Sequence, residues 1–238
     1  MKKISVFLLS CFLSVQMMAQ KSIENGHIKM EIVEATSDNE EMAMGLEMLK
    51  GTETNYYFDD ERTLVTQSMM GGMVEVATMT TIKDKTIEMF FNMMGNKTYV
   101  ETSEKELNQG QDTLNNPTKN MKVVYNRKNR KKIAGFDCFE ATITNPDLEE
   151  NAVSFTMYVS DEIKANSKMI KTLSEFNIEG FPLEFSIEME QMKMVYSTTA
   201  VADSFDQSVF KIDRTGYTKM TMEQFQQQMG GMGQGLGF

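Results

Sequence analysis

Apolar and polar residues alternate along much of this chain, most regularly between Thr52 and Glu101. Turn-forming clusters interrupt the alternation at intervals of roughly eleven to thirteen residues, the spacing of consecutive antiparallel hairpins. These clusters are Asp59-Asp60-Glu61, Gly71-Gly72, Lys83-Asp84-Lys85 and Gly95-Asn96. Between the last two, one side of a strand carries Ile87, Met89, Phe91 and Met93. A strand of this kind buries one face, so the segment predicts a five-stranded antiparallel meander.

Helical spacing replaces the alternation in residues 37–50, between the meander and a strand predicted at 27–35. Met42, Leu46 and Leu49 fall on one face of this helix. Ser37 or Asp38 is expected to cap its first turn, and Gly51 is expected to end it.

The second half of the chain returns to alternation after a polar loop at 109–120. Strands are predicted at 121–126, 136–144 and 152–160. A helix is expected next, at about 161–176. The last pair of strands begins at Phe181, and its alternation changes phase at Gln191. A turn or bulge at Glu190-Gln191 is the simplest cause of that change.

The C-terminal segment has a different character. Thr221-Met222-Glu223-Gln224 fits a capping box and predicts a short helix through Gln228. Residues 230–238 are rich in glycine and are expected to be disordered. Because neither side of the loop at 109–120 closes a core alone, residues 20–229 are expected to form a single mainly β domain with an antiparallel sheet.

The N-terminus has the features of a secretory signal peptide. Lys2-Lys3 is followed by a short apolar run and then by Ala19, after which a signal peptidase could cut. The run is too short to cross a membrane as a helix. A protein exported in this way lies in the periplasm or is secreted. Lipidation at Cys11 is the minor alternative, because the apolar run continues past that cysteine.

The net charge of −10 makes several partners implausible. It becomes more negative when Lys2 and Lys3 leave with the signal peptide, and such a surface repels nucleic acid and anionic headgroups. Nucleic acid is therefore not expected as a partner, whereas association with a membrane is possible but is not expected to be integral. Cys138 is the one cysteine outside the leader, so the mature chain forms no internal disulfide. On its predicted strand, Cys138 is expected to be a buried, inert thiol.

Methionine is unusually frequent, with 24 residues in the chain. Many fall on apolar strand faces, where methionine acts as a flexible filler of a core or groove. Thioethers also bind Cu(I), and closely spaced methionines occur at 42/44, 69/70/73, 93/94, 189/192/194, 220/222 and 229/232. These groups are scattered along the chain, so the filler interpretation leads and Cu(I) binding is an alternative.

Other candidates for chemistry are weak. His27 is the single histidine and has no serine or cysteine at motif spacing, which argues against a catalytic triad. The acidic clusters Asp59-Asp60-Glu61 and Asp147-Leu148-Glu149-Glu150 lack the spacing of a calcium loop. No phosphate-binding or zinc motif occurs. The sequence therefore predicts neither an enzyme nor a bound cofactor or metal.

Several short motifs, taken in order, carry a family resemblance. They are Lys29-Met30-Glu31-Ile32, Tyr57-Phe58-Asp59-Asp60-Glu61-Arg62-Thr63, Asn92 to Val100, Lys132 to Ala141 and Glu179-Gly180-Phe181-Pro182-Leu183-Glu184. In this order the chain resembles a family of exported Gram-negative bacterial proteins classed as a domain of unknown function. It is also similar in outline to the periplasmic lipoprotein carriers LolA and LolB. The resemblance implies a strongly curved half-barrel of about ten or eleven strands with helices on its concave side.

The resemblance, together with the apolar pattern, suggests a non-enzymatic binder of lipid or lipoprotein acyl chains, or of another apolar ligand. Candidate contacts in the concavity are Met42, Leu46, Leu49, Met89, Phe91, Met93, Phe155 and Phe185. The helix at 37–50 is expected to act as a lid. Burial is also expected for Val153, Met157, Leu183 and Ile187. The alternative to a binder is an interaction or scaffold module whose concavity is filled.

Overall fold

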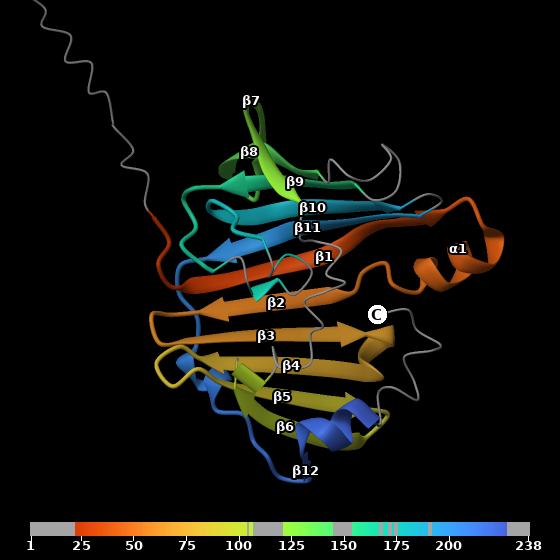
Figure 1. Cartoon of the computed structure of the whole chain (residues 1–238), viewed down its shortest axis with the longest axis vertical. Coiled ribbons are helices and arrows are strands. Elements are labelled where there is room, and N and C mark those ends of the chain that lie inside the picture. Colours follow the sequence, from red (N-terminus) through yellow and green to blue (C-terminus); the bar gives the residue numbers. More distant parts are fainter. Residues whose placement is uncertain are drawn as a thin grey trace, which may run out of the picture.

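The alternating segments of the chain form strands that join in one sheet (Figure 1). In this computed structural model the described residues are 22–103, 105–106, 121–144, 154–166, 169–170, 173, 176–189 and 192–227. Within them the strands are β1 (Gly26–Ser37), β2 (Glu53–Phe58), β3 (Arg62–Met69), β4 (Val74–Thr81), β5 (Thr86–Met93), β6 (Asn96–Ser103), β7 (Lys122–Ile133), β8 (Phe136–Thr144), β9 (Ser154–Ser160), β10 (Phe181–Met189), β11 (Met192–Ala202) and β12 (Thr218–Met220). The predicted leader, polar loop and glycine-rich tail lie outside the described residues.

The twelve strands follow the order β12-β6-β5-β4-β3-β2-β1-β11-β10-β9-β8-β7. Neighbours are antiparallel, except that β12 runs parallel to β6. The predicted meander is confirmed as β2–β6. The phase change at Gln191 is also explained, because Met189 and Met192 pair where β10 and β11 meet. Since β7 and β12 are edge strands, the protein has a mainly β fold with an open, curved sheet.

The first helix is shorter than its pattern predicts. Strand β1 continues to Ser37, and α1 spans Glu40–Glu47. Asn39, rather than Ser37 or Asp38, caps it, because the Asn39 side chain accepts hydrogen bonds from the backbone of Glu41 and Met42. The predicted end at Gly51 is close to the observed one, since Gly51 has a φ of 74° in the turn that follows.

The helix predicted at 161–176 is wrong for the residues that the structure describes there. They form bends and isolated 3₁₀ turns, and Ile163 forms a parallel bridge with Ile23. The backbone N–H of Ile23 donates to Glu162 at 2.8 Å, and that of Lys164 donates to Ile23 at 2.8 Å. An α-helix would bury only one side of this segment, whereas the irregular path buries Ile163, Ile170, Leu173, Phe176 and Ile178.

The strand registers divide the side chains between two faces. The face that carries Met30 and Tyr56 also carries Phe185 and Met157, and is called the inner face here. The described residues of segment 161–180 cross in front of β1 and β11 and fill this part of the inner face (Figure 1). The main core therefore lies between these strands, β8–β10 and this segment.

The C-terminal segment after β11, residues 203–227, wraps around one edge of the sheet and is called the C-terminal strap. Phe205 contacts Tyr57 on the outer face, with ring centroids 5.4 Å apart. After the 3₁₀ turn η4 (Gln207–Phe210), β12 pairs with β6, and a helix at 222–227 follows (Figure 1). There Phe225 stacks on Phe91 of the inner face at 4.6 Å.

The capping box predicted for that last helix is confirmed. Thr221 N–H donates to the Gln224 side chain at 2.9 Å, and Gln224 N–H donates to the Thr221 hydroxyl at 3.1 Å. These reciprocal bonds satisfy two backbone donors that a helix start otherwise leaves without partners. Gln228, where the helix was expected to end, lies outside the described residues.

Candidate functional site

The inner face of β3–β5 carries a strip of apolar and threonine side chains. Cross-strand pairing places Val65 beside Thr78, Thr78 beside Met89, and Val76 beside Phe91. These five residues, called the inner strip, are all half-buried. By contrast, the part of the same face over β8–β11 is filled by residues 161–180. The inner strip is therefore the less covered part of the apolar inner face.

The predicted alternation of β5 is confirmed, but the outer side of this strand is buried more deeply than the inner side. Ile87, Met89, Phe91 and Met93 share the inner face and are half-buried. On the outer side Phe90 is 1% exposed, even though outer sides of such strands usually contact water. The cause is the C-terminal strap, because Tyr217 contacts the Phe90 ring edge-on at 5.5 Å. The sequence gives no local signal for this second covered face.

The other residues expected on the inner face lie there as predicted. Met157, Leu183, Phe185 and Ile187 are buried, and Phe155 is half-buried against the same core. Val153 lies outside the described residues.

The eight predicted ligand contacts do not form one compact site. Met89, Phe91 and Met93 lie on β5, whereas Phe155 and Phe185 lie on β9 and β10. Strands β5 and β10 are six positions apart in the sheet, or roughly 29 Å along it at the usual strand spacing. Phe155 contacts Phe176, and Phe185 stacks on Tyr196, so both belong to the filled core.

The helix contacts form a third group at the end of β1 and β11. Leu46 is buried against Ile32 and Ala35, and Leu49 contacts the same small cluster. Met42 is 46% exposed and is not part of this cluster among the described residues. Helix α1 therefore covers the end of the two central strands.

Three hydroxyl groups lie within the apolar inner face. Tyr56 and Tyr196 are close enough to interact, and burial, followed by that interaction, raises the pKa of Tyr56 well above its usual value. Thr198 is 6% exposed, and its hydroxyl has no hydrogen-bond partner among the described residues. Sequence reasoning missed this group because threonine and tyrosine are ordinary strand residues. Such hydroxyls could bind the polar end of an otherwise apolar ligand.

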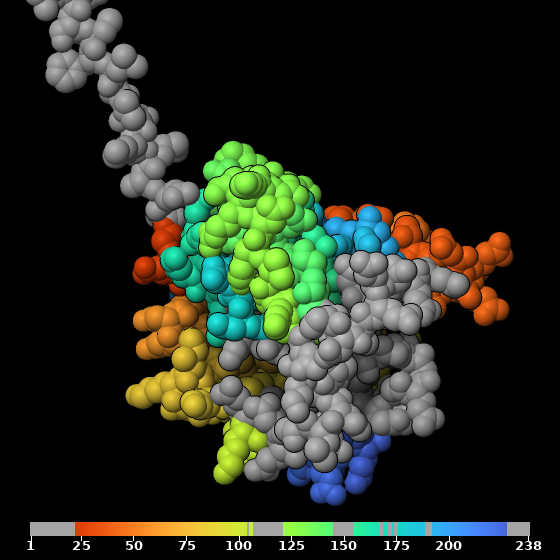
Figure 2. Space-filling view, turned by 45° about the horizontal axis from the view of Figure 1, so that its top comes forward, coloured from red at the N-terminus to blue at the C-terminus, as the bar shows by residue number. Residues whose placement is uncertain are grey.

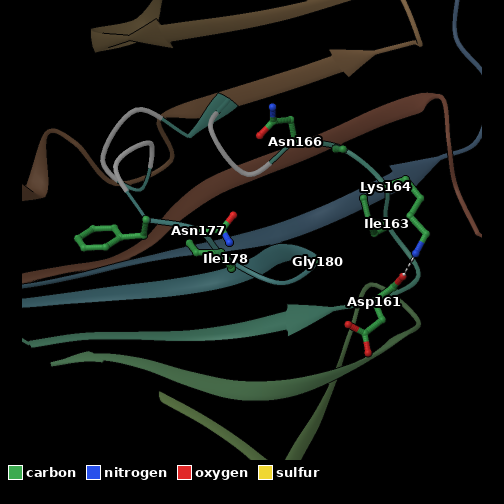
Figure 3. Close-up of a pocket in the computed structure, with 9 residues that line it drawn as sticks. Asp161, Ile163, Lys164, Asn166, Asn177, Ile178 and Gly180 are labelled. Carbon is green, nitrogen blue, oxygen red and sulfur yellow. Dashed lines mark hydrogen bonds between the residues drawn. The ribbon is translucent and has the colours of Figure 1, made fainter. Parts of the chain in front are cut away.

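Two small pockets are present, each of about 240 Å³. The first lies between two limbs of the covering segment, 161–166 and 176–180 (Figure 3). Lys164 Nζ donates to the backbone carbonyl of Asp161 at its rim, at 3.0 Å. Gly180 is needed beside it, since its φ is 77° and a Cβ there would collide with the carbonyl oxygen of Ser160.

The second pocket lies at the other end of the sheet. It is lined by residues of the α1–β2 connection, of β2, of the end of β3 and of the turn that follows, namely Met48, Lys50, Gly51, Thr52, Glu53, Ser68, Met70 and Gly71. Both pockets are smaller than a typical cavity for a drug-sized ligand, which begins at about 300 Å³.

The two residues with the most reactive side chains, His27 and Cys138, make contacts typical of structural residues. His27 stacks on Tyr57 at 4.3 Å, and its Nε2 lies 2.8 Å from Asn55 Oδ1. Cys138 is buried as predicted, and burial raises its pKa to about 12. Within the described part of the chain, no three His, Cys, Asp or Glu residues are grouped so that they could hold a metal ion. In the same residues, no helix has the length and apolar character needed to span a bilayer.

Comparison with known proteins gives one family match. Residues 39–215 match the family described as a domain of unknown function (DUF4412). Among curated proteins, none matches the chain in sequence.

Similarity to solved structures is distant. MucB shares 9% identity at a TM-score of 0.33, with 82% of this chain and 59% of that chain covered. LprF from Mycobacterium bovis shares 12% identity at a TM-score of 0.30, with 79% of this chain and 89% of that chain covered. An outer membrane lipoprotein-sorting protein domain from Vibrio parahaemolyticus shares 8% identity at a TM-score of 0.20, with 81% of this chain and 92% of that chain covered. Likenesses this distant say nothing of a ligand.

Proposed function

The chain belongs to the DUF4412 family, whose description assigns no chemistry, and we propose from its own residues that it is a non-enzymatic binding protein. Its ligand is an acyl chain or another elongated apolar group, which lies against the inner strip. The signal-like N-terminus supports a location in the periplasm or outside the cell.

One observation carries this proposal, namely that the apolar inner face is filled over β8–β11 but only half-buried over β3–β5. Removing apolar surface from water favours binding by about 25 cal/mol per Å². Met89 is unbranched and Thr78 is small, so the strip can adapt to chains of different shape. Phe155, Phe185 and Leu46 then support the curved face from the core rather than touch the ligand.

The hydroxyls of Tyr56, Tyr196 and Thr198 support a ligand that is not wholly apolar. They belong to the same inner face, on β2 and β11. The Thr198 hydroxyl has no partner among the described residues, and a carboxyl, ester or hydroxyl group at one end of the ligand would give it a hydrogen bond. Lipids and lipoproteins with acyl chains have such groups.

The test fills the inner strip with a larger side chain. Thr78→Trp places an indole in the middle of the strip, whereas Thr66→Trp makes the same change on the outer face of the neighbouring strand. Both threonines are half-buried, which makes them a matched pair. The probe is cis-parinaric acid, a fatty acid that fluoresces when it enters an apolar site.

We expect the wild type and Thr66→Trp to bind the probe alike and Thr78→Trp to bind it about tenfold more weakly or worse, a change of about 1.4 kcal/mol. Circular dichroism checks that both variants keep the sheet. No binding by the wild type, or equal binding by all three proteins, would contradict the proposal. The scaffold interpretation, in which the concavity is filled, would then lead.

A further inference from the structure

Exposed methionines gather at one end of the sheet. Nine large apolar side chains are exposed among the described residues, and six of them are methionines. Their exposed fractions are 46% for Met42, 75% for Met44, 58% for Met48, 39% for Met70, 46% for Met73 and 79% for Met94. The role of core filler, which explains buried methionines such as Met30 and Met157, does not apply to these six.

The six residues come from three elements that meet in space. Met48 follows α1, while Met70 and Met73 belong to the turn between β3 and β4, which contains the 3₁₀ turn η1 (Met70–Gly72). Met48 and Met70 line the same pocket. The backbone N–H of Met94, in the β5–β6 turn, donates to the carbonyl of Met73 at 2.8 Å. Figure 1 shows α1 and these turns at the same end of the sheet.

Turn formation does not explain these methionines either. Met70 and Met94 have φ angles of 53° and 52°, in the left-handed region. Glycine, asparagine and aspartate adopt this region readily, whereas other residues do so at a cost of roughly 1 kcal/mol. The side chains of Met70 and Met94 are therefore exposed to water, at positions whose backbone conformation favours other residue types. The property of methionine that is left to explain its presence here is the thioether sulfur.

We propose that the pocket between α1 and the β3–β4 turn is a Cu(I) site, with the sulfur atoms of Met48 and Met70 as ligands. Thioethers are soft and uncharged, and they select Cu(I) over zinc, magnesium or calcium. Met73, three residues after Met70 in the same turn, is the candidate third ligand.

The charges around the pocket allow a monovalent cation. Glu53 lines it, but its carboxylate is paired with the Lys29 ammonium group at 2.6 Å. Lys50 also lines it, but its ammonium group is paired with Glu47 at 2.6 Å. The net charge of −10 further raises the local concentration of cations. This site does not depend on the inner strip, so Thr78→Trp should leave metal binding unchanged.

Silver is the first probe, because Ag(I) is diamagnetic and has the same ligand preference as Cu(I). Protein with ¹³C-labelled methionine methyl groups is titrated with Ag(I) and followed by NMR. We expect the methyl signals of Met48 and Met70 to shift and saturate at one equivalent, while those of Met42 and Met44 stay in place. Shifts spread equally over all exposed methionines, or none at one equivalent, would overturn the proposal.

The second test measures Cu(I) affinity by competition with bicinchoninate under reducing, oxygen-free conditions. Met48→Leu/Met70→Leu removes two sulfurs but keeps the apolar volume, and should weaken binding at least about tenfold. Met42→Leu/Met44→Leu is the matched control from the same helical segment and should bind as the wild type does. Equal affinity of both double variants would exclude the site and leave an apolar docking surface as the explanation for the exposed methionines.

Discussion

At the level of single residues, Cys138 shows what burial does to a reactive group. Its side chain lies on β8 with no exposed surface, and the sulfur is 3.6 Å from the carbonyl oxygen of Phe136. Burial disfavours the thiolate and raises the pKa of Cys138 from 9.0 to about 12. The thiolate is the nucleophile, so the folded protein has almost none at neutral pH.

We predict that iodoacetamide at pH 8 leaves Cys138 unmodified in the native protein and modifies it completely in urea, as measured by mass spectrometry. Because the thiol stays protonated longer in the folded state, the free energy of unfolding should fall as pH rises from 9.0 towards 12. Rapid modification of the folded protein would mean that β8 opens locally.

A second residue-level feature is the carboxylate of Glu88, which is buried on the outer side of β5 at 7% exposure. Arg214 of the C-terminal strap forms an ion pair with it. A buried carboxylate that loses its partner keeps the cost of its desolvation. The ion pair therefore stabilises the packing of the C-terminal strap on the sheet, because separating the two would leave the Glu88 charge without its partner.

Arg214→Leu should lower the free energy of unfolding by about 1–3 kcal/mol in urea denaturation, because Glu88 then lacks its cation. Adding Glu88→Gln should restore part of the loss, since the buried charge is removed. Lys83→Leu, an exposed change in the β4–β5 turn, should cost less than about 0.5 kcal/mol. If Arg214→Leu cost no more than this control, the ion pair would be unimportant for stability.

At the level of elements, the C-terminal strap touches both faces of the same sheet. Residues 222–227 are the described part of its helix, and a short helix is unstable in water without tertiary contacts. Phe225 on Phe91 supplies such a contact on the inner strip. If the inner strip binds an acyl chain, that chain and Phe225 compete for Phe91.

Phe225→Ala should therefore bind cis-parinaric acid more tightly than the wild type, while losing about 0.5–1.5 kcal/mol of stability with the aromatic pair. Phe205→Ala is the matched control, because it removes an aromatic contact of the same strap from the outer face. Its affinity for the probe should not change. Weaker binding by Phe225→Ala would instead make Phe225 part of the ligand site.

At the level of the whole molecule, an open sheet has two edges that could pair with other chains. The β7–β8 hairpin stands at one edge and projects from the body in Figure 2. Strand β7 carries six cationic side chains, Lys122, Arg127, Lys128, Arg130, Lys131 and Lys132. Positive charge on an edge strand opposes edge-to-edge association. The other edge ends in β12, which is only three residues long.

Lys128→Thr/Arg130→Thr removes two of these charges and adds residues that favour strands. We expect larger species to appear in size-exclusion chromatography with light scattering as the protein concentration rises. The control Lys83→Thr/Lys211→Thr also removes two positive charges, but at positions that are not on β7. It should elute as the wild type does. Identical profiles for both variants would show that charge on β7 does not limit association.

Sequence reasoning predicted those parts of the fold that depend on neighbours in the chain. Period-two alternation between short turns predicts β2–β6, and a phase change predicts the β10–β11 hairpin. The capping box at Thr221 is local as well. Even the shared face of Met89 and Phe185 could be predicted, because side-chain direction on a strand follows from its alternation.

Tertiary structure decided what depends on distant contacts. Residues 161–176 have a helix-like apolar spacing, yet those that the structure describes pack on the curved face of β1 and β8–β11 in bends and 3₁₀ turns. The burial of Glu88 and Phe90 comes from a strap more than a hundred residues later in the chain. The pocket shared by Met48 and Met70 exists because α1 and the β3–β4 turn meet at one end of the sheet. Local pattern determines which face a side chain takes, whereas only the folded chain determines what covers that face.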